Sequence, residues 1–130
     1  MPVNKRHILI VTALAATAVT AVAVPVSSGS SEAKRATPKI TVGDDYFAPD
    51  DDVTVKKNSK VKWVWDANNT DTHNVAVTSK RPKGVKASDF KSSSGAVGLT
   101  FAPKFKVPGT YEFVCTYHKN VMRMNVKVKK

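Results

Sequence analysis

Hydrophobic and polar positions alternate in short runs from residue 39 to the end of the chain, and Pro, Gly, Asn or Asp separates the runs. Val61, Trp63 and Trp65 share one side of such a run, while Lys62 and Val64 share the other. Side chains two residues apart point to the same face of a β-strand. No stretch has the roughly 3.6-residue period of an amphipathic helix. The pattern therefore predicts an all-β domain with both tryptophans in its core.

The predicted strands are short and closely spaced. Runs rich in Val, Thr and aromatic residues lie at 40–42, 46–49, 53–56, 61–65, 74–77, 99–105, 111–115 and 122–129. Pro108 and Gly109 together are a strong turn signal. The segment 80–98 is basic and rich in Ser and Gly, which indicates a long surface connection with room for one helical turn. Seven or eight short strands at this spacing predict a Greek-key β-sandwich.

The N-terminus has the features of a secretory signal peptide. A basic start precedes an apolar run over 8–24, and Ala21, Val22 and Ala23 supply small residues for cleavage. An uncleaved membrane anchor is the alternative, and the run is at the short edge of the roughly 17–25 residues that span a bilayer. The expected organisation is a signal peptide at 1–23, a flexible linker at 24–38 and a folded domain at 39–130. Such a protein is exported, works in the periplasm or another extracytoplasmic space, and is membrane-tethered if the leader is kept.

The charge of the chain is strongly positive. Its 130 residues include 21 Lys and Arg against 10 Asp and Glu. Cleavage of the leader removes Lys5 and Arg6 but no acid, so 19 basic groups remain and the formal charge is +9. We expect redox partner proteins with acidic docking surfaces, or an anionic membrane or cell-envelope surface. Nucleic acid is not expected, because exported chains seldom meet it and the lysines are scattered.

Cys115 is the only cysteine. Exported proteins work in oxidising compartments and usually pair their cysteines in disulfides. A single thiol there pairs with another chain, stays buried and inert, or binds a metal ion. The third possibility is favoured, because Cys115, His118 and Met122 follow one another across a strand end and a tight loop. His73 lies in an upstream loop and is the only other histidine outside the leader.

Two imidazoles, a thiolate and a thioether suit copper. Copper alternates between Cu(I), which favours soft sulfur, and Cu(II), which accepts imidazole nitrogen, and a trigonal His2Cys site with a weak axial Met serves both states. Zinc also binds Cys and His, but a structural zinc site requires more thiolates or histidines than this chain has. One copper ion of the type-1 kind is therefore the expected cofactor.

The chain resembles the cupredoxin family, and most of all its small plastocyanin-like and amicyanin-like members. The matching segments cover nearly all of 39–128, and they are YFAP at 46–49, VKWVW at 61–65, THNV at 72–75, VPGTYEFVCTYH at 107–118 and VKV at 126–128. The resemblance implies that His73 and His118 are the imidazole ligands and Cys115 the thiolate ligand. It also implies that Met122 is the axial sulfur ligand and that Asn74 steadies the loop bearing the cysteine.

Two departures from the family pattern concern the axial ligand. Three residues separate His118 from Met122, where close relatives commonly have two or four, and Met124 stands where a glycine is frequent. Strand alternation places Met124 on the same face as Val126, which favours core packing. The sequence leaves open whether Met122 or Met124 is the axial ligand. Changes at this position should tune the reduction potential more than copper binding.

The expected function is one-electron transfer by a monomeric blue-copper protein. After His73 and His118 are used, no histidine outside the leader remains for a second, catalytic copper centre, so an enzyme is not expected. In relatives of this kind, electrons pass through the edge of the histidine that corresponds to His118. A copper-handling role is the alternative, in which a buffer, chaperone or resistance protein binds Cu(I) and passes it on. A cupredoxin-shaped interaction module without metal is a remote third possibility, because the ligand set is intact.

Overall fold

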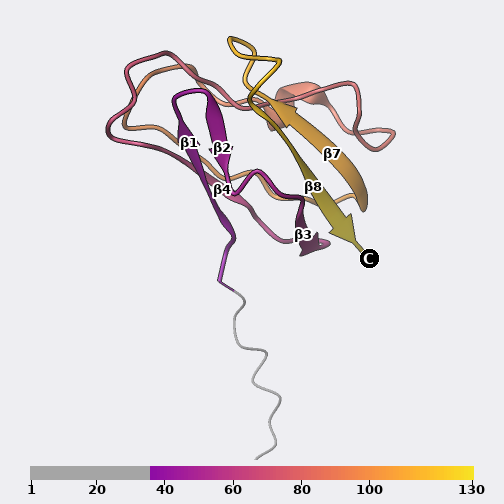
Figure 1. Cartoon of the computed structure of the whole chain (residues 1–130). Helices are drawn as coiled ribbons and strands as arrows, with labels where there is room; N and C mark the ends of the chain where they lie inside the picture. The colour runs from indigo at the N-terminus through magenta and orange to yellow at the C-terminus, as the bar shows by residue number, and fades with distance from the viewer. Residues whose placement is uncertain (1–35) are drawn as a thin grey trace, which may run out of the picture. The chain divides into compact units, whose positions relative to one another are not determined.

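The computed structural model describes residues 36–130, which form two four-stranded sheets packed into a sandwich (Figure 1). The first sheet consists of β1 (Lys39–Gly43), β2 (Tyr46–Ala48), β4 (Lys62–Trp65) and β6 (Thr100–Phe101), in the order β2-β1-β4-β6. The second consists of β3 (Val53–Lys56), β5 (Ala76–Val77), β7 (Gly109–Val114) and β8 (Arg123–Lys129), in the order β3-β8-β7-β5. These eight strands confirm the predicted all-β sandwich.

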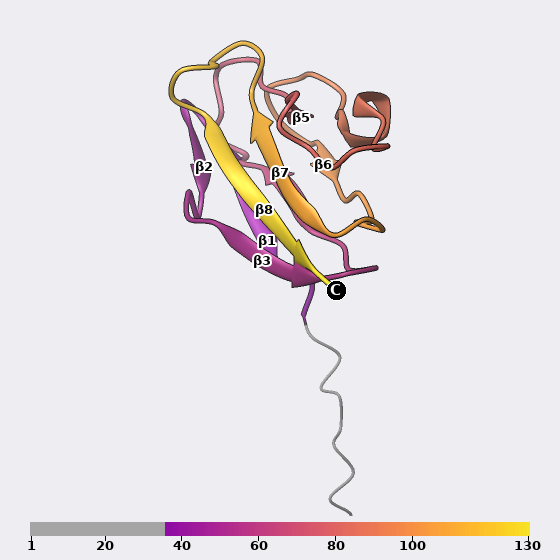
Figure 2. The ribbon, with the colours of Figure 1, turned by 90° about the vertical axis from the view of Figure 1, so that its right-hand side faces the viewer.

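Each sheet contains both parallel and antiparallel pairs. Strand β1 runs parallel to β4, and β3 runs parallel to β8, whereas the remaining neighbours are antiparallel. The pairing of β7 with β8 ends where Val114 lies opposite Arg123. The loop 115–122 therefore projects from one end of the sandwich, beside the turn that joins β1 to β2 (Figure 2). We call this the loop end of the domain.

The core lies between the sheets and follows from the alternation in the sequence. Trp63 and Trp65 are 0% and 4% exposed, which confirms their predicted burial. The ring centroids of Trp63 and Phe113 are 4.8 Å apart, so the two sheets meet directly through aromatic contacts. Aromatic pairs at such distances stabilise a core beyond the area that they bury. Residues 34–130 form one compact unit, and this core fixes the ends of the strands that carry the site.

The segment 99–105 is less regular than predicted. Only Thr100 and Phe101 pair with β4, because Pro103 follows and has no N–H to donate to a ladder. Phe105 is nonetheless fully buried, and its backbone bonds to the turn at Asn58 and Ser59 over 2.7 and 2.9 Å. The prediction of a strand-like segment is therefore confirmed in part, since Lys104 pairs again with Lys60 in an isolated bridge and the inward aromatic side chains pack in the core. The connection 80–98 holds one 3-10 turn, η1 (Ala87–Phe90), as expected.

The predicted signal peptide and residues 24–35 of the linker lie outside the described residues, so both stay predictions. Within residues 36–130, no helix has the length and hydropathy needed to span a bilayer.

Candidate metal centre

The loop after β7 brings three of the predicted ligands together. The Cys115 N–H donates to the Met122 carbonyl over 3.1 Å, so the two ends of the loop are joined by a backbone hydrogen bond. The His118 N–H donates to the Cys115 carbonyl over 3.1 Å, and the Met122 N–H donates to the His118 carbonyl over 3.0 Å. These bonds form a tight double turn. The spacing of Cys, His and Met in the sequence therefore becomes a fixed arrangement of their backbones.

His73 reaches the same place from the segment between β4 and β5. Its backbone N–H and carbonyl bond reciprocally to Gly95, at 3.0 and 3.1 Å. The indole Nε1 of Trp65 donates to the carbonyls of both residues, over 3.3 and 3.0 Å respectively. Trp65 is thus more than a core residue, because its ring nitrogen holds the backbone that presents His73.

The side chains of Cys115, His73 and His118 meet at the loop end. The Cys115 Sγ lies 4.0 Å from His73 Nδ1 and 3.6 Å from His118 Nδ1, and the three donor atoms all lie within 4.8 Å of one another. Metal–ligand bonds of about 2.0–2.3 Å in a trigonal arrangement separate their donors by about 3.5–4.0 Å. Two nitrogens and one thiolate at these separations fit copper.

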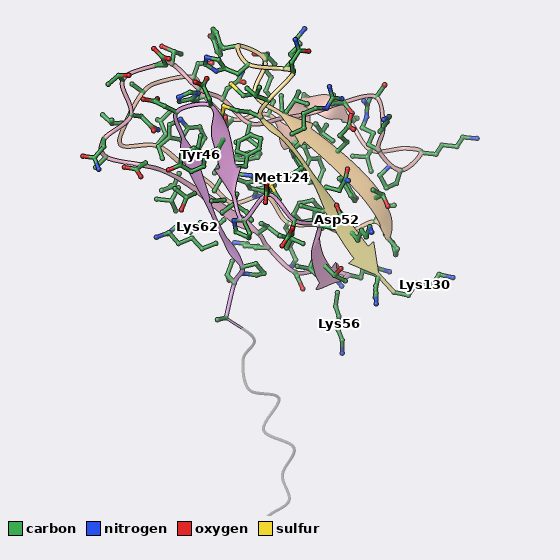
Figure 3. The ribbon with its side chains drawn as sticks, in the orientation of Figure 1. Tyr46, Asp52, Lys56, Lys62, Met124 and Lys130 are labelled. Atoms are coloured by element: carbon green, nitrogen blue, oxygen red, sulfur yellow. The ribbon has the colours of Figure 1, made fainter. Side chains whose placement is uncertain are left out.

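The two candidate axial residues occupy different surroundings. Met122 is fully buried, and its backbone is hydrogen-bonded to Cys115 and His118 at the base of the loop. Met124 is 4% exposed and lies opposite Phe113 in the β7–β8 ladder. Figure 3 places it in the body of the sandwich, where it packs in the core as the strand alternation predicted. Only Met122 belongs to the loop that holds Cys115 and His118.

Asn74 connects the segment of His73 to the loop of Cys115. Its amide Nδ2 donates to Thr116 Oγ1 over 2.8 Å, and its Oδ1 accepts from the Thr116 N–H over 2.8 Å. Asn74 itself is 2% exposed, so its amide is shielded from water although Thr116 is exposed. The residues next to two predicted ligands are therefore tied together across 42 positions of sequence.

Asp44 is a site residue that sequence reasoning missed. Its Oδ1 lies 2.8 Å from His73 Nε2, and its carboxylate also accepts from the Thr70 N–H and hydroxyl. These hydrogen bonds, that from His73 above all, hold the pKa of the Asp44 carboxyl well below its usual range. A carboxylate can only accept, so the Nε2 of His73 carries the proton. The Nδ1 lone pair is then free to face Cys115 and a metal ion.

The second imidazole has one partly exposed edge. The His118 side chain is 23% exposed, whereas that of His73 is 0% exposed. The Nε2 of His118 lies 3.6 Å from the Oδ1 of Asp45, and the Asp45 side chain is mostly exposed. Asp71 also approaches, so that Asp45, Asp71 and His118 form a second, surface group of possible donors. The one sequence signal for these acids is that Asp44 and Asp45 are adjacent in a strongly basic chain.

Residues 37–129 match the family model described as copper binding proteins of the plastocyanin/azurin family. The match spans most of the chain, so this protein belongs to that family. It is a copper-binding protein of the electron-carrier type, with a cupredoxin fold. The family and the copper cofactor expected from the sequence are thereby confirmed.

Solved structures with a similar fold include three copper proteins. An oxidized proline-to-glycine variant of amicyanin gives a TM-score of 0.58 and 23% identity, over 76% of this chain and 88% of that one. The purple cupredoxin from Nitrosopumilus maritimus gives a TM-score of 0.57 and 18% identity, over 71% of this chain and 99% of that one. Cu-containing nitrite reductase from Thermus scotoductus SA-01 gives a TM-score of 0.59 and 18% identity, over 72% of this chain but only 22% of the enzyme. No curated protein sequence matches the chain.

Proposed function

We propose that this protein is an exported one-electron carrier in which His73, Cys115, His118 and Met122 hold one type-1 copper ion. The observation that supports this best is the buried Nδ1, Sγ and Nδ1 cluster with a single partly exposed imidazole edge. Bound copper supplies the change between Cu(I) and Cu(II). The protein supplies a donor set that suits both states and a scaffold that holds it in place.

The hydrogen bonds around the cluster favour fast transfer. His73 is held on one side by Asp44 and through its backbone by Gly95, while Cys115 is held by Met122. Ligands that move little between oxidation states need little reorganisation when an electron passes. His118 is the natural exit, because its edge is 23% exposed while Cys115 and His73 are fully buried.

The surface around His118 suits a redox partner. Tyr117 and Val121 are 55% and 62% exposed in the same loop, and apolar patches of this kind mark interaction sites. Asp45 and Asp71 give the immediate surroundings of His118 negative charge. The acidic docking surface predicted for the partner stays a prediction. Such an acidic surface would bind lysines that lie away from Asp45 and Asp71.

Catalysis by this chain alone is not part of the proposal. The sequence has three histidines, and His7 belongs to the predicted leader. His73 and His118 both belong to the one cluster. An electron carrier needs no further centre, and we propose that the protein acts as a monomer outside the cytoplasm.

Copper retention during redox cycling tests the electron carrier against the copper-handling alternative. We expect one reversible one-electron couple, and a copper content that stays constant through repeated reduction and oxidation in the presence of bicinchoninate, a Cu(I) chelator. Copper content is measured by atomic absorption after gel filtration. Transfer of most of the copper to the chelator in the first reduced state would favour copper handling instead.

Paired leucine substitutions test the axial ligand. Met122→Leu is expected to keep the thiolate-to-copper band and raise the reduction potential, because loss of the thioether withdraws a donor that stabilises Cu(II). Met124→Leu conserves volume in the core and is expected to leave the potential unchanged. Voltammetry of both variants measures this. A shift with Met124→Leu alone would assign the axial position to Met124.

A further inference from the structure

A group of lysines gathers at the end of the sandwich opposite the loop end, and we call it the basic end. Its members are Lys39, Lys56, Lys57, Lys60, Lys62, Lys104, Lys129 and Lys130, all exposed. They come from five segments of the chain that the fold brings together. Lys39 pairs with Lys62, Lys56 with Lys129, and Lys60 with Lys104. Figure 3 shows Lys56 projecting away from the loop end, and Lys62 and Lys130 projecting outward to the two sides.

The charges of the basic end are not neutralised locally. Within residues 36–130, no carboxylate lies within 4.0 Å of any of these ammonium groups. Elsewhere on the domain, Lys127 is paired with Asp52 at 2.6 Å, Arg123 with Glu112 at 2.8 Å and Lys80 with Glu112 at 3.4 Å. The basic end thus presents free positive charge to any partner that approaches it.

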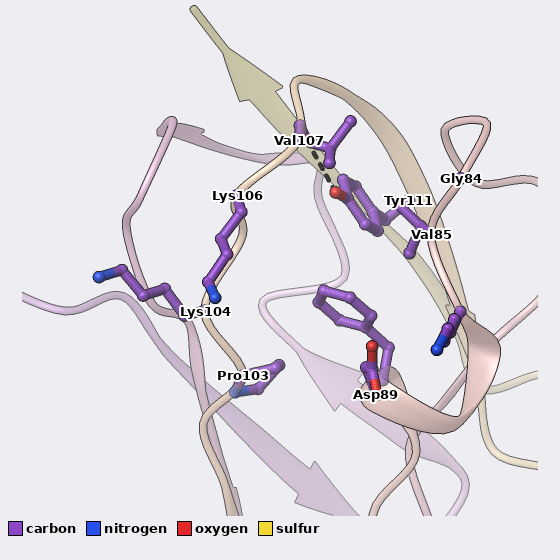
Figure 4. A pocket seen from close by; sticks show the side chains of 10 residues that line it. Gly84, Val85, Asp89, Pro103, Lys104, Lys106, Val107 and Tyr111 are labelled. Atoms are coloured by element: carbon purple, nitrogen blue, oxygen red, sulfur yellow. Dashed lines mark hydrogen bonds between the residues drawn. The ribbon is translucent and has the colours of Figure 1, made fainter.

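Two hollows adjoin the basic end and share Lys104 in their walls. One has a volume of about 360 Å³ and is lined by Lys56, Lys60 and the chain at Pro38. The other has a volume of about 290 Å³ and is lined by Tyr111 and Asp89, with Lys104 and Lys106 along one side (Figure 4). They are near the lower limit of ligand pockets, at about 300–1,000 Å³. Each has room for an anionic headgroup between its lysines, and Asp89 is the one carboxylate that lines either.

The opposite end of the domain has the opposite sign. Asp44, Asp45 and Asp71 lie around the two histidines at the loop end, and Asp66 follows directly after β4. The seven residues of β8 separate the two ends by about 20 Å, at about 3.3 Å per residue. This exceeds the Debye length of about 8 Å at physiological ionic strength. An anionic surface at the basic end therefore attracts the lysines without strongly repelling these aspartates.

We propose that the basic end docks on an anionic membrane surface, and that this contact turns the His118 edge outward toward redox partners. A membrane accounts for the observations better than an acidic protein does. The lysines are spread over a whole end of the domain instead of one compact patch. Residues 36–38 line the hollow at this same end, so a leader that is kept would tether this end to the membrane. The outward orientation of the copper centre rests on the proposed function, whereas the docking itself does not.

Sedimentation with lipid vesicles tests the docking. The full chain and the compact unit 34–130 are each mixed with vesicles of phosphatidylcholine, or of equal parts phosphatidylcholine and phosphatidylglycerol, with and without copper. We expect both proteins to bind the anionic vesicles whatever their copper content, and added salt to release unit 34–130. Because binding is measured without copper as well, failure of the docking and failure of the electron-carrier function are separate results.

Charge-matched triple variants locate the contact. Each lysine at an anionic bilayer strengthens binding roughly fivefold, so Lys56→Gln, Lys60→Gln and Lys104→Gln together should weaken the binding of unit 34–130 about 100-fold. The control carries the same loss of charge away from the basic end, as K80Q, K91Q and K119Q, and should weaken it much less. Equal weakening by both triples, or no binding to anionic vesicles, would overturn the proposal. Binding to soluble polyglutamate without binding to vesicles would overturn it in favour of an acidic protein partner.

Discussion

Cys115→Ser is expected to abolish both the intense visible absorption of the copper-loaded protein and its reversible one-electron couple. The absorption arises from charge transfer between a thiolate and Cu(II), and the serine hydroxyl is neither a soft donor nor ionised near neutral pH. Weak binding of Cu(II) through the nitrogens of His73 and His118 is expected to remain, with the pale colour of a nitrogen-only site. Visible spectra during titration with Cu(II), together with voltammetry, measure the effect.

Two controls separate loss of the ligand from loss of the fold. A buried hydroxyl in place of the thiol costs about 1–3 kcal/mol of stability, so denaturant unfolding of the apoprotein must show that C115S is still folded. Tyr117→Ser introduces the same hydroxyl two residues away, on a side chain that is 55% exposed, and should keep the band and the couple. Survival of the blue band in C115S would remove Cys115 from the site.

The parts of the structure that follow from local pattern could be predicted. Alternation fixed the faces of β4 and β8, because side chains two residues apart must share a face of a strand, and Trp63, Trp65 and Val126 are buried as a result. Cys115 and His118 could be grouped because they are three residues apart, where one tight loop holds them. His73 could be added because the chain has no other histidine beyond the leader.

Contacts between distant residues could not be predicted in the same way. Asp44 lies 29 positions before His73, and their 2.8 Å contact depends on how the β1–β2 turn packs against the segment before β5. The hydrophobic and polar pattern of neither segment predicts this packing. The predicted strand over 99–105 is interrupted for a related reason, since the backbone of Phe105 bonds to the turn at Asn58 and Ser59 instead of continuing a regular ladder. A scatter of lysines along the sequence likewise became a basic end only through the pairing of strands.

The second large effect is expected from Asn74→Ala. The substitution removes the amide that joins Asn74 to the Thr116 N–H and hydroxyl, and leaves a small gap beside Val75 and Cys115, which are both fully buried. Two such hydrogen bonds at a 2% exposed side chain predict a loss of about 2 kcal/mol in the free energy of unfolding of the apoprotein. Groups that hold metal ligands in place typically change metal affinity about 10–100-fold when removed. Copper should therefore leave the variant at least about tenfold faster.

Asn125→Ala is the matched control, because it removes the same kind of side chain at a position outside the metal centre. The Nδ2 of Asn125 donates over 2.9 Å to the exposed Asp52. Asn125 lies on β8, beyond the loop 115–122. Exposed contacts of this kind change stability by about 0.5 kcal/mol or less. Denaturant unfolding of both apoproteins and stopped-flow transfer of copper to a chelator measure the two effects. If Asn74→Ala matches Asn125→Ala in both measurements, the Asn74–Thr116 contact does not hold the loop. The backbone bonds that join Met122 with Cys115 and with His118 then hold it instead.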